Sequence, residues 1–221
     1  MATKRRPGRE VAQDRGGGEF WIDHAVLEEG DLAWLRSATW LMLWNVAVPP
    51  GFLAQLPNLW GLDLRGGSAT DLSVVDGCPA LRCLVVNQVR GLSDLSIVPT
   101  LTTVELLAVY GLRQVTTAPS LAALPALRRL QVGQMRGLPA LAGLLDAPGL
   151  KELMLHKSVN VTADDVARIK GHPTLTHFGW YAEDVPLSRW RPVVEAIALP
   201  RPATVSPKAW FSPKDADRLE S

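Results

Sequence analysis

The stretch Pro79-Ala80-Leu81-Arg82-Cys83-Leu84-Val85-Val86 is one copy of a motif that recurs along this chain. A proline opens the motif, and apolar residues stand at its third, sixth and eighth positions. Five further copies follow the same pattern and cover residues 57–64, 99–106, 125–132, 148–155 and 173–180. Six copies in one register are more than a leucine-rich composition produces by chance, so the motif predicts an architecture built from repeats.

Each copy ends in an alternation that is typical of a β-strand. In Leu62-Asp63-Leu64, the two leucines face one side of a strand and Asp63 faces the other. A strand this short cannot bury its apolar face alone, whereas a parallel stack of such strands lines one continuous core. The residues expected in that core are Leu59, Leu62, Leu64, Leu81, Leu84, Val86, Leu101, Val104, Leu106, Leu127, Leu130, Val132, Leu150, Leu153, Leu155, Leu175, Phe178 and Trp180.

The spacing of the copies indicates the kind of repeat. The first strand residue that faces the core lies at positions 20, 41, 62, 84, 104, 130, 153 and 178, which includes two early copies without the proline. Periods of about 20–29 residues around a Leu-x-x-Leu-x-Leu core are typical of leucine-rich repeats. Residues 19–184 therefore resemble a bacterial leucine-rich repeat protein with short repeats. The resemblance implies an α/β solenoid, a horseshoe with a parallel concave sheet of about eight short strands and a convex side of 3-10, helical and extended segments.

The turn after each strand departs from that family. Residues 89–92, 109–112 and 135–138 share the pattern apolar-x-Gly-Leu, in which the glycine is expected to supply a positive φ at the bend. The asparagine that usually caps this turn in the family is replaced by Val89, Val109 and Met135. The backbone groups that an asparagine ladder would pair therefore need other partners.

The two ends of the chain differ from the repeats. Residues 1–18 contain a basic start and a Gly16-Gly17-Gly18 run, which predict a flexible tail. Residues 185–221 include a helix expected over 193–199 and then an irregular proline-containing stretch, and we assign them to a C-terminal cap and tail, because the open end of a stack needs covering. Further helices are expected at 27–35 and, from a capping box at Thr162, through Ile169 to a stop at Gly171.

Composition excludes several classes of function. The chain has 221 residues and a net charge of +1, which does not favour a nucleic-acid or membrane-surface partner. No apolar run reaches the roughly 20 residues of a membrane span. Cys78 and Cys83 are the two cysteines, which favours free thiols in a reduced, cytoplasmic protein over a disulfide or a zinc site. The use of arginine far more often than lysine suggests a bacterial source. No motif for a cofactor or a resident metal is present.

The strand residues that face away from the core are not required for folding, so we examine them for function. They would form the concave face, the surface expected to bind a protein partner. The candidate partner-binding residues are Trp21, Trp40, Met42, Trp44, Asp63, Arg65, Asn87, Glu105, Leu107, Arg129, Gln131, Glu152, Met154, His156, His177 and Tyr181.

Three groups of these residues each allow two interpretations. The tryptophans at 21, 40 and 44 are either an interface patch or core beneath a covering segment. The central charges, among them Arg129 and Glu152, are either solvated pairs or an electrostatic footprint. His156 and His177 suggest a metal or a general base, but no carboxylate stands at ligand spacing.

Three functional hypotheses follow. The first is a non-enzymatic recognition module that grips a protein partner with the concave face, for example a scaffold or a toxin-neutralising, immunity-type protein. The second is a structural subunit of a larger assembly that docks through Trp190, Trp210 and Phe211 near the C-terminus. The third is a hydrolase-like enzyme using His156, His177 and Glu152. The oligomeric state stays open.

Overall fold

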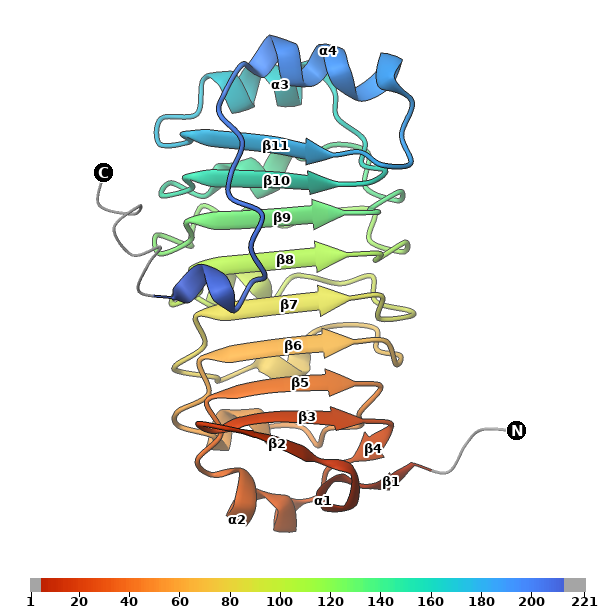
Figure 1. The fold of residues 1–221 in the computed structure, drawn as a ribbon, viewed down its shortest axis with the longest axis vertical. Helices are drawn as coiled ribbons and strands as arrows, with labels where there is room; N and C mark the ends of the chain where they lie inside the picture. Colours follow the sequence, from red (N-terminus) through yellow and green to blue (C-terminus); the bar gives the residue numbers. More distant parts are fainter. Residues whose placement is uncertain (1–4, 213–221) are drawn as a thin grey trace.

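A nine-stranded sheet runs the length of the molecule in the computed structural model, which describes residues 5–212 (Figure 1). Its strand order is β11-β10-β9-β8-β7-β6-β5-β3-β2, so each strand from β3 onward lies beside the next large strand of the chain. All pairs are parallel except β2 with β3. The bounds are β2 (Gln13–Gly16), β3 (Glu19–Asp23), β5 (Trp40–Trp44), β6 (Gly61–Arg65), β7 (Cys83–Asn87), β8 (Leu106–Tyr110), β9 (Arg129–Gly133), β10 (Glu152–His156) and β11 (His177–Tyr181).

The core lies on one side of this sheet, between the strands and the segments that connect them. The second residue of every parallel strand is buried, and Leu62, Leu84, Leu130, Leu153 and Phe178 are all fully inaccessible. Burying one such side chain contributes about 1.5–3 kcal/mol relative to leaving it in water. The predicted core is confirmed, except that Leu64 is only partly buried and Leu106 lies on the opposite side of the sheet.

The strand register predicted for the fifth repeat is wrong by three residues. Leu107, and not Val104, pairs with Leu84 on one side and Leu130 on the other. Both Val104/Leu106 and Leu107/Val109 satisfy a period-two pattern, so local sequence does not choose between them. The backbone hydrogen bonds decide between the two registers. Glu105 N and Leu106 N both donate to Arg82 O, at 2.8 and 3.1 Å, which places Glu105 before the strand.

The corrected register makes the repeat more regular. Successive core positions Phe20, Leu41, Leu62, Leu84, Leu107, Leu130, Leu153 and Phe178 are separated by 21, 21, 22, 23, 23, 23 and 25 residues. Two candidate site residues therefore lie elsewhere than the sequence predicted. Leu107 is in the core with 1% exposure, and Glu105 lies outside β8, where its carboxylate pairs with Arg82 at 2.6 Å.

One of the three residues predicted to replace the turn asparagine, Val109, lies inside β8 and not in a turn. The residue that follows each parallel strand of the sheet except β11 takes the left-handed conformation and pairs the turn through its backbone. Its φ lies between 47° and 71°, and the residues are His24, Asn45, Gly66, Gln88, Gly111, Gln134 and Lys157. Each of these residues donates its backbone N–H to the last carbonyl of the neighbouring strand, as Gln88 N does to Tyr110 O at 2.8 Å. A backbone ladder therefore satisfies the turn. Gly91 and Gly111 have the expected positive φ, but Gly137 is not among the positive-φ residues, and a Cβ there would lie 2.5 Å from Arg113 O.

The connecting segments are mostly short 3-10 turns, as the repeat length predicts. They are η2 (Leu53–Gln55), η3 (Ser73–Val75), η4 (Val98–Thr100) and η5 (Ala142–Asp146). The predicted capping-box helix is confirmed as α3 (Ala163–Lys170), in which Thr162 Oγ1 accepts from Asp165 N and Gly171 is the C-cap. The helix expected at 27–35 divides into η1 (Glu29–Asp31) and α2 (Leu32–Leu35). None of the helices in residues 5–212 has the length and apolar character that crossing a membrane requires.

The N-terminal segment, residues 5–18, is folded against the sheet and differs from the flexible tail expected over residues 1–18, of which residues 1–4 lie outside the described residues. Within it, β1 (Arg6–Pro7) pairs with β4 (Ala25–Val26), and α1 (Gly8–Val11) connects β1 to β2. Strand β2 pairs with the edge strand β3, and Val11 packs against the core. Strand β2 pairs with the edge of β3, the first parallel strand, which would otherwise be unpaired.

The C-terminal segment caps one end of the sheet, as the sequence predicted, and it also crosses the side of the sheet opposite the core, which the sequence did not predict. Helix α4 (Leu187–Ile197) begins six residues earlier than expected and packs against α3 and β11, which covers that end of the sheet. Beyond α4, residues 200–211 turn back and run across the strands on the side opposite the core, ending in η6 (Ala209–Phe211) (Figure 1). We call residues 200–211 the C-terminal strap.

The corrected register can be tested through stability. Leu107→Ala is expected to lower the free energy of unfolding by about 3 kcal/mol, because it leaves a cavity in the core. Glu105→Ala removes only a partly exposed ion pair and should cost less than about 1 kcal/mol. Urea unfolding followed by circular dichroism measures both. The register would be refuted if Glu105→Ala were the more costly change.

Candidate functional site

The candidate site is the face of the sheet opposite the core, which we call the outer face. It carries the first, third and fifth residues of each strand from β3 to β11. The third residues form its central row, Trp21, Met42, Asp63, Val85, Ala108, Gln131, Met154 and Gly179. All the sequence-predicted site residues lie on this face except Glu105 and Leu107. In β8 the outer-face residues are Leu106, Ala108 and Tyr110, and not the residues that the predicted register placed there, which include Glu105 and Leu107.

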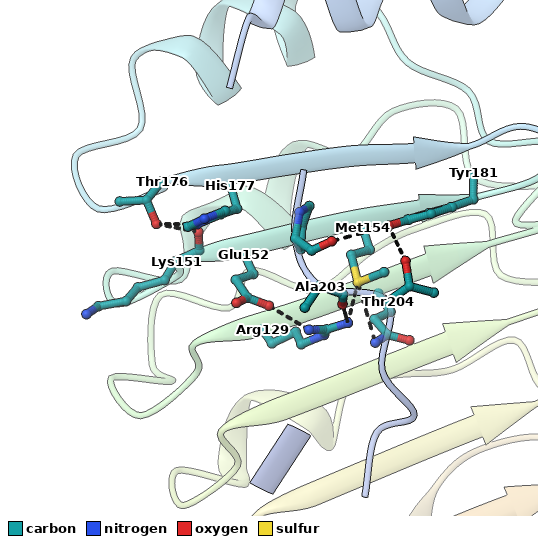
Figure 2. A network of polar contacts seen from close by, with 11 residues as sticks. Arg129, Lys151, Glu152, Met154, Thr176, His177, Tyr181, Ala203 and Thr204 are labelled. Atoms are coloured by element: carbon teal, nitrogen blue, oxygen red, sulfur yellow. Dashed lines mark hydrogen bonds and ion pairs between the residues drawn. The ribbon is translucent and has the colours of Figure 1, made fainter. Parts of the chain in front are cut away.

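The C-terminal strap covers the middle of the outer face. Near β11, Phe178 N donates to Pro200 O at 2.9 Å, and the Tyr181 hydroxyl lies 2.7 Å from Thr204 Oγ1 (Figure 2). A Cβ at Gly179 would lie 3.1 Å from Pro202 Cδ, so the glycine permits this close crossing. At the other end, Lys208 Nζ pairs with Glu19 on β3.

An aromatic cluster anchors the end of the strap. Trp210 is 5% exposed and packs in one apolar cluster with Trp40, Cys83, Val85, Leu106 and Ala108. Neighbouring rings meet edge to face, with centroids 4.9 Å apart for Trp210–Phe211, 5.2 Å for Phe211–Trp60 and 5.1 Å for Trp60–Trp40. Trp40 lies over Gly61, where any Cβ would be 1.9 Å from its ring. Edge-to-face pairs add about 0.5–1.5 kcal/mol beyond the area buried.

A buried ion pair holds the strap from below. Arg129 has no exposed surface, and its Nη1 lies 2.7 Å from Glu152 Oε2 (Figure 2). Its Nη2 donates to the strap carbonyl of Ala203 at 3.1 Å. With its amide oxygen turned toward the guanidinium, Gln131 accepts from Arg129 Nε at 3.0 Å. These residues therefore serve the internal packing of the face.

The other predicted charges are also paired. Asp63 is 3% exposed and accepts from Arg65 Nε and Nη2 at 2.9 and 2.8 Å. This hydrogen bonding raises the pKa of Arg65 above its ordinary value. These four charges therefore form two pairs. Arg129–Glu152 joins β9 to β10 and is buried, unlike the solvated pairs expected, whereas Asp63 and Arg65 pair within β6 and Arg65 is partly exposed.

The strap leaves the N-terminal end of the outer face open. Trp44 is 42% exposed, and Trp21 and Met42 are partly exposed beside it. Trp21 and Met42 line a hollow of about 400 Å³, together with Arg15, Glu19, Phe20, Trp40 and Lys208. Arg15 lies over the Trp21 ring at 5.0 Å. We call Trp21, Met42 and Trp44 the open aromatic patch.

A second, smaller hollow lies beside the strap near the carboxyl ends of the strands. It measures about 200 Å³, and its lining includes Arg65, Asn87, Tyr110, His156 and Pro207. The His156 ring stacks on Tyr181, 5.3 Å between centroids, and its Nε2 is buried without a hydrogen-bond partner. Burial, with the nearby Arg129 charge, lowers the pKa of His156 below its ordinary value.

The two histidines that suggested catalysis are not brought together. In the aligned pair of β10 and β11, Glu152 lies opposite His177 and His156 lies opposite Tyr181. The two histidines are thus four positions apart, about 13 Å along the strands. The described part of the chain contains no group of three or more His, Cys, Asp or Glu that could hold a metal ion.

The cysteines are buried free thiols. Burial raises the pKa of Cys78 to about 11, and it also raises the pKa of Cys83, which lies in the cluster under the strap. Thiolates are the reactive form, so both groups are chemically protected while they stay buried.

No protein-family model matches the chain, and no curated protein matches it significantly.

Sequence reasoning missed the residues that close the outer face. Trp60, Val205, Trp210 and Phe211 join its apolar cluster, although none of them belongs to a strand. The sequence feature that could have revealed this cover was the aromatic pair at 210–211, which we assigned to a terminal cap or an external docking surface. An apolar row at Cys83, Val85, Leu106 and Ala108 is unusual for a solvated sheet face, and it would have indicated a cover.

The buried ion pair can be tested by removing one partner or both. Arg129→Met leaves Glu152 as an uncompensated buried carboxylate, and we expect it to lower the free energy of unfolding by about 3–5 kcal/mol. Arg129→Met combined with Glu152→Leu should recover most of this loss, as measured by urea unfolding. Additive losses in the double variant would contradict the pairing.

The environment of His156 predicts a pH dependence. Because its pKa is lower in the folded state than in the unfolded chain, protonation favours unfolding, and stability falls as pH drops below about 6.5. His156→Gln should therefore lose less unfolding free energy between pH 7 and pH 5 than the wild type does. Equal losses in parallel urea titrations would argue against a desolvated His156.

Proposed function

We propose that this chain is a non-enzymatic recognition module, built as a leucine-rich-repeat-type solenoid, that binds a protein partner through the outer face. The strand order supports the architecture, since short parallel strands follow one another along the sheet at intervals of 21 to 25 residues. Such stacks present long regular faces that commonly serve binding. A scaffold or an immunity-type protein in the bacterial cytoplasm fits this proposal.

The observation that carries the proposal is the open aromatic patch. Folding does not require apolar side chains at these outward positions, yet Trp44 exposes 42% of its surface beside Trp21 and Met42. Tryptophan is enriched among the residues that dominate binding energy at protein interfaces. The adjoining hollow offers a concave seat for one side chain of a partner.

The two other hypotheses have less support. A docking role for the C-terminal aromatic residues would need them free, whereas Trp210 and Phe211 pack on the chain's own sheet. An enzyme that used His156, His177 and Glu152 would need them close together, whereas the histidines are separated and Glu152 is bound to Arg129. Trp190 on α4 packs partly against the core.

The proposal predicts the effect of removing the patch. Trp44→Ala combined with Trp21→Ala should weaken binding of a partner, isolated from the source organism, by at least about tenfold, because each is expected to act as an anchor. Isothermal titration with the purified partner measures the affinity. Leu187→Ala on α4 is the matched control, since Leu187 is a 60% exposed apolar residue outside the outer face. Unchanged affinity in the double tryptophan variant would refute this patch as the binding surface.

A further inference from the structure

We infer that the C-terminal strap occupies, within the same chain, a groove for an extended peptide segment of the partner, and that binding requires the strap to leave. This inference rests on the proposed function and names both the partner's chemistry and the regulation of the same face. The groove is the strip of the outer face that the strap covers, with Cys83, Val85, Leu106 and Ala108 at its floor.

The way in which the strap is attached suits a removable cover. Only its first residue meets the sheet edge, where Pro200 O accepts from Phe178 N of β11, and from there the strap runs across the strands (Figure 1). Prolines at 200, 202 and 207 remove three backbone donors from it. Six of its residues, Pro200, Arg201, Thr204, Ser206, Lys208 and Ala209, are exposed. The attachment depends instead on separate points: the carbonyls of Pro200, Pro202 and Ala203, the Thr204 hydroxyl, the Lys208–Glu19 pair, and the apolar side chains of Val205, Trp210 and Phe211.

The floor of the groove is apolar at positions that the core does not use. Cys83 and Leu106 have no exposed surface, and Val85 and Ala108 are each 6% exposed, with the strap in place. These side chains lie on the opposite face from the core leucines of the same strands. They form an apolar strip on the outer face, and in this structure Val205, Trp210 and Phe211 of the strap pack on it.

The contacts of the strap describe the peptide that would replace it. Arg129 donates to a backbone carbonyl, so the segment is extended with a free C=O at that point. Glu19 receives a lysine, and two residues later an aromatic ring enters the pocket formed with Trp40. The expected ligand is therefore a segment that is extended where it meets Arg129 and then forms a short 3-10 turn, in which a basic residue precedes an aromatic anchor.

The open aromatic patch connects to the strap and provides a route for displacement. The hollow beside Trp21 and Met42 is also lined by Lys208 of the strap and by Trp40, which contacts the strap's cluster. A partner that enters this hollow meets the Lys208–Glu19 pair first. Competition for Glu19 would release the end of the strap before its aromatic anchor.

Cys83 gives a direct readout of strap opening. Its thiol is fully buried in the strap's cluster, so its reaction with a soluble thiol reagent reports exposure of the floor. We would measure this rate in full-length protein carrying Cys78→Ser, alone and combined with Lys208→Glu or with Trp210→Ala and Phe211→Ala. Lys208→Glu places like charges beside Glu19 while keeping the aromatic anchor, and Leu187→Ala is the control. Circular dichroism verifies that each variant is folded.

The second measurement uses a fluorescent synthetic peptide of residues 200–212. We expect Cys83 to react at least about tenfold faster in both strap variants than in the wild type or in Leu187→Ala. We also expect the peptide to bind the Trp210→Ala/Phe211→Ala variant at least about tenfold more tightly than it binds the wild type, and to slow the modification of Cys83. A peptide of scrambled sequence should have neither effect.

Several results would overturn the inference. A folded Lys208→Glu or Trp210→Ala/Phe211→Ala protein with Cys83 still protected would show that the strap is not the cover. Peptide binding that is absent, or equal in wild type and variant, would show that the groove does not accept an extended segment. A dimer that exchanges straps, detected by light scattering, would assign the groove to a second copy of the chain. None of these results bears on the effect of Trp44→Ala, so the proposed function is judged separately.

Discussion

The structure depends on the pairing of strands that are each too short to be stable alone. Each of the eight parallel strands in the nine-stranded sheet has five residues, and its backbone and core side chains need neighbouring strands. The connections satisfy the same constraint, because the left-handed residue after each of these strands except β11 donates its N–H to the last carbonyl of the next strand in the sheet. Regular stacking leaves three surfaces to be covered: two ends and the outer face. Different pieces of the chain cover each of them.

The two ends are covered by regular structure and the outer face by an irregular strap. Strand β2 extends the sheet at one end, and helix α4 packs on β11 at the other. The strap instead rests on an aromatic cluster, the Arg129–Glu152 pair and the glycine at 179. Burying Arg129 has a high desolvation cost, and the pair with Glu152, the Gln131 amide and the Ala203 carbonyl together offset it. The strap and the outer face thus stabilise each other through polar and apolar contacts.

The repeat pattern predicted the strands and their core well, because period-two alternation and chain spacing are local signals. It failed at β8, where two overlapping alternations fit equally and the proline at 99 favoured the wrong one. It identified the outer-face residues of seven strands, yet it assigned Trp40, Arg129 and Glu152 to a partner when they serve internal packing. The repeat pattern also did not place Trp210 and Phe211 on the sheet, since no local sequence feature indicates that residues 200–211 turn back.

The sequence by itself determined the sheet and most of its register, along with the residues available on its outer face, because alternation and repeat length act between near neighbours. Only the tertiary structure decided which of those residues stay open. The strap brings Trp210 to Trp40, some 170 residues earlier in the chain, and no periodic signal encodes so distant a contact. The motif around Leu84 is an example: Leu84 was assigned to the core from its position alone, whereas the burial of Cys83 and Val85 depends on the other end of the chain.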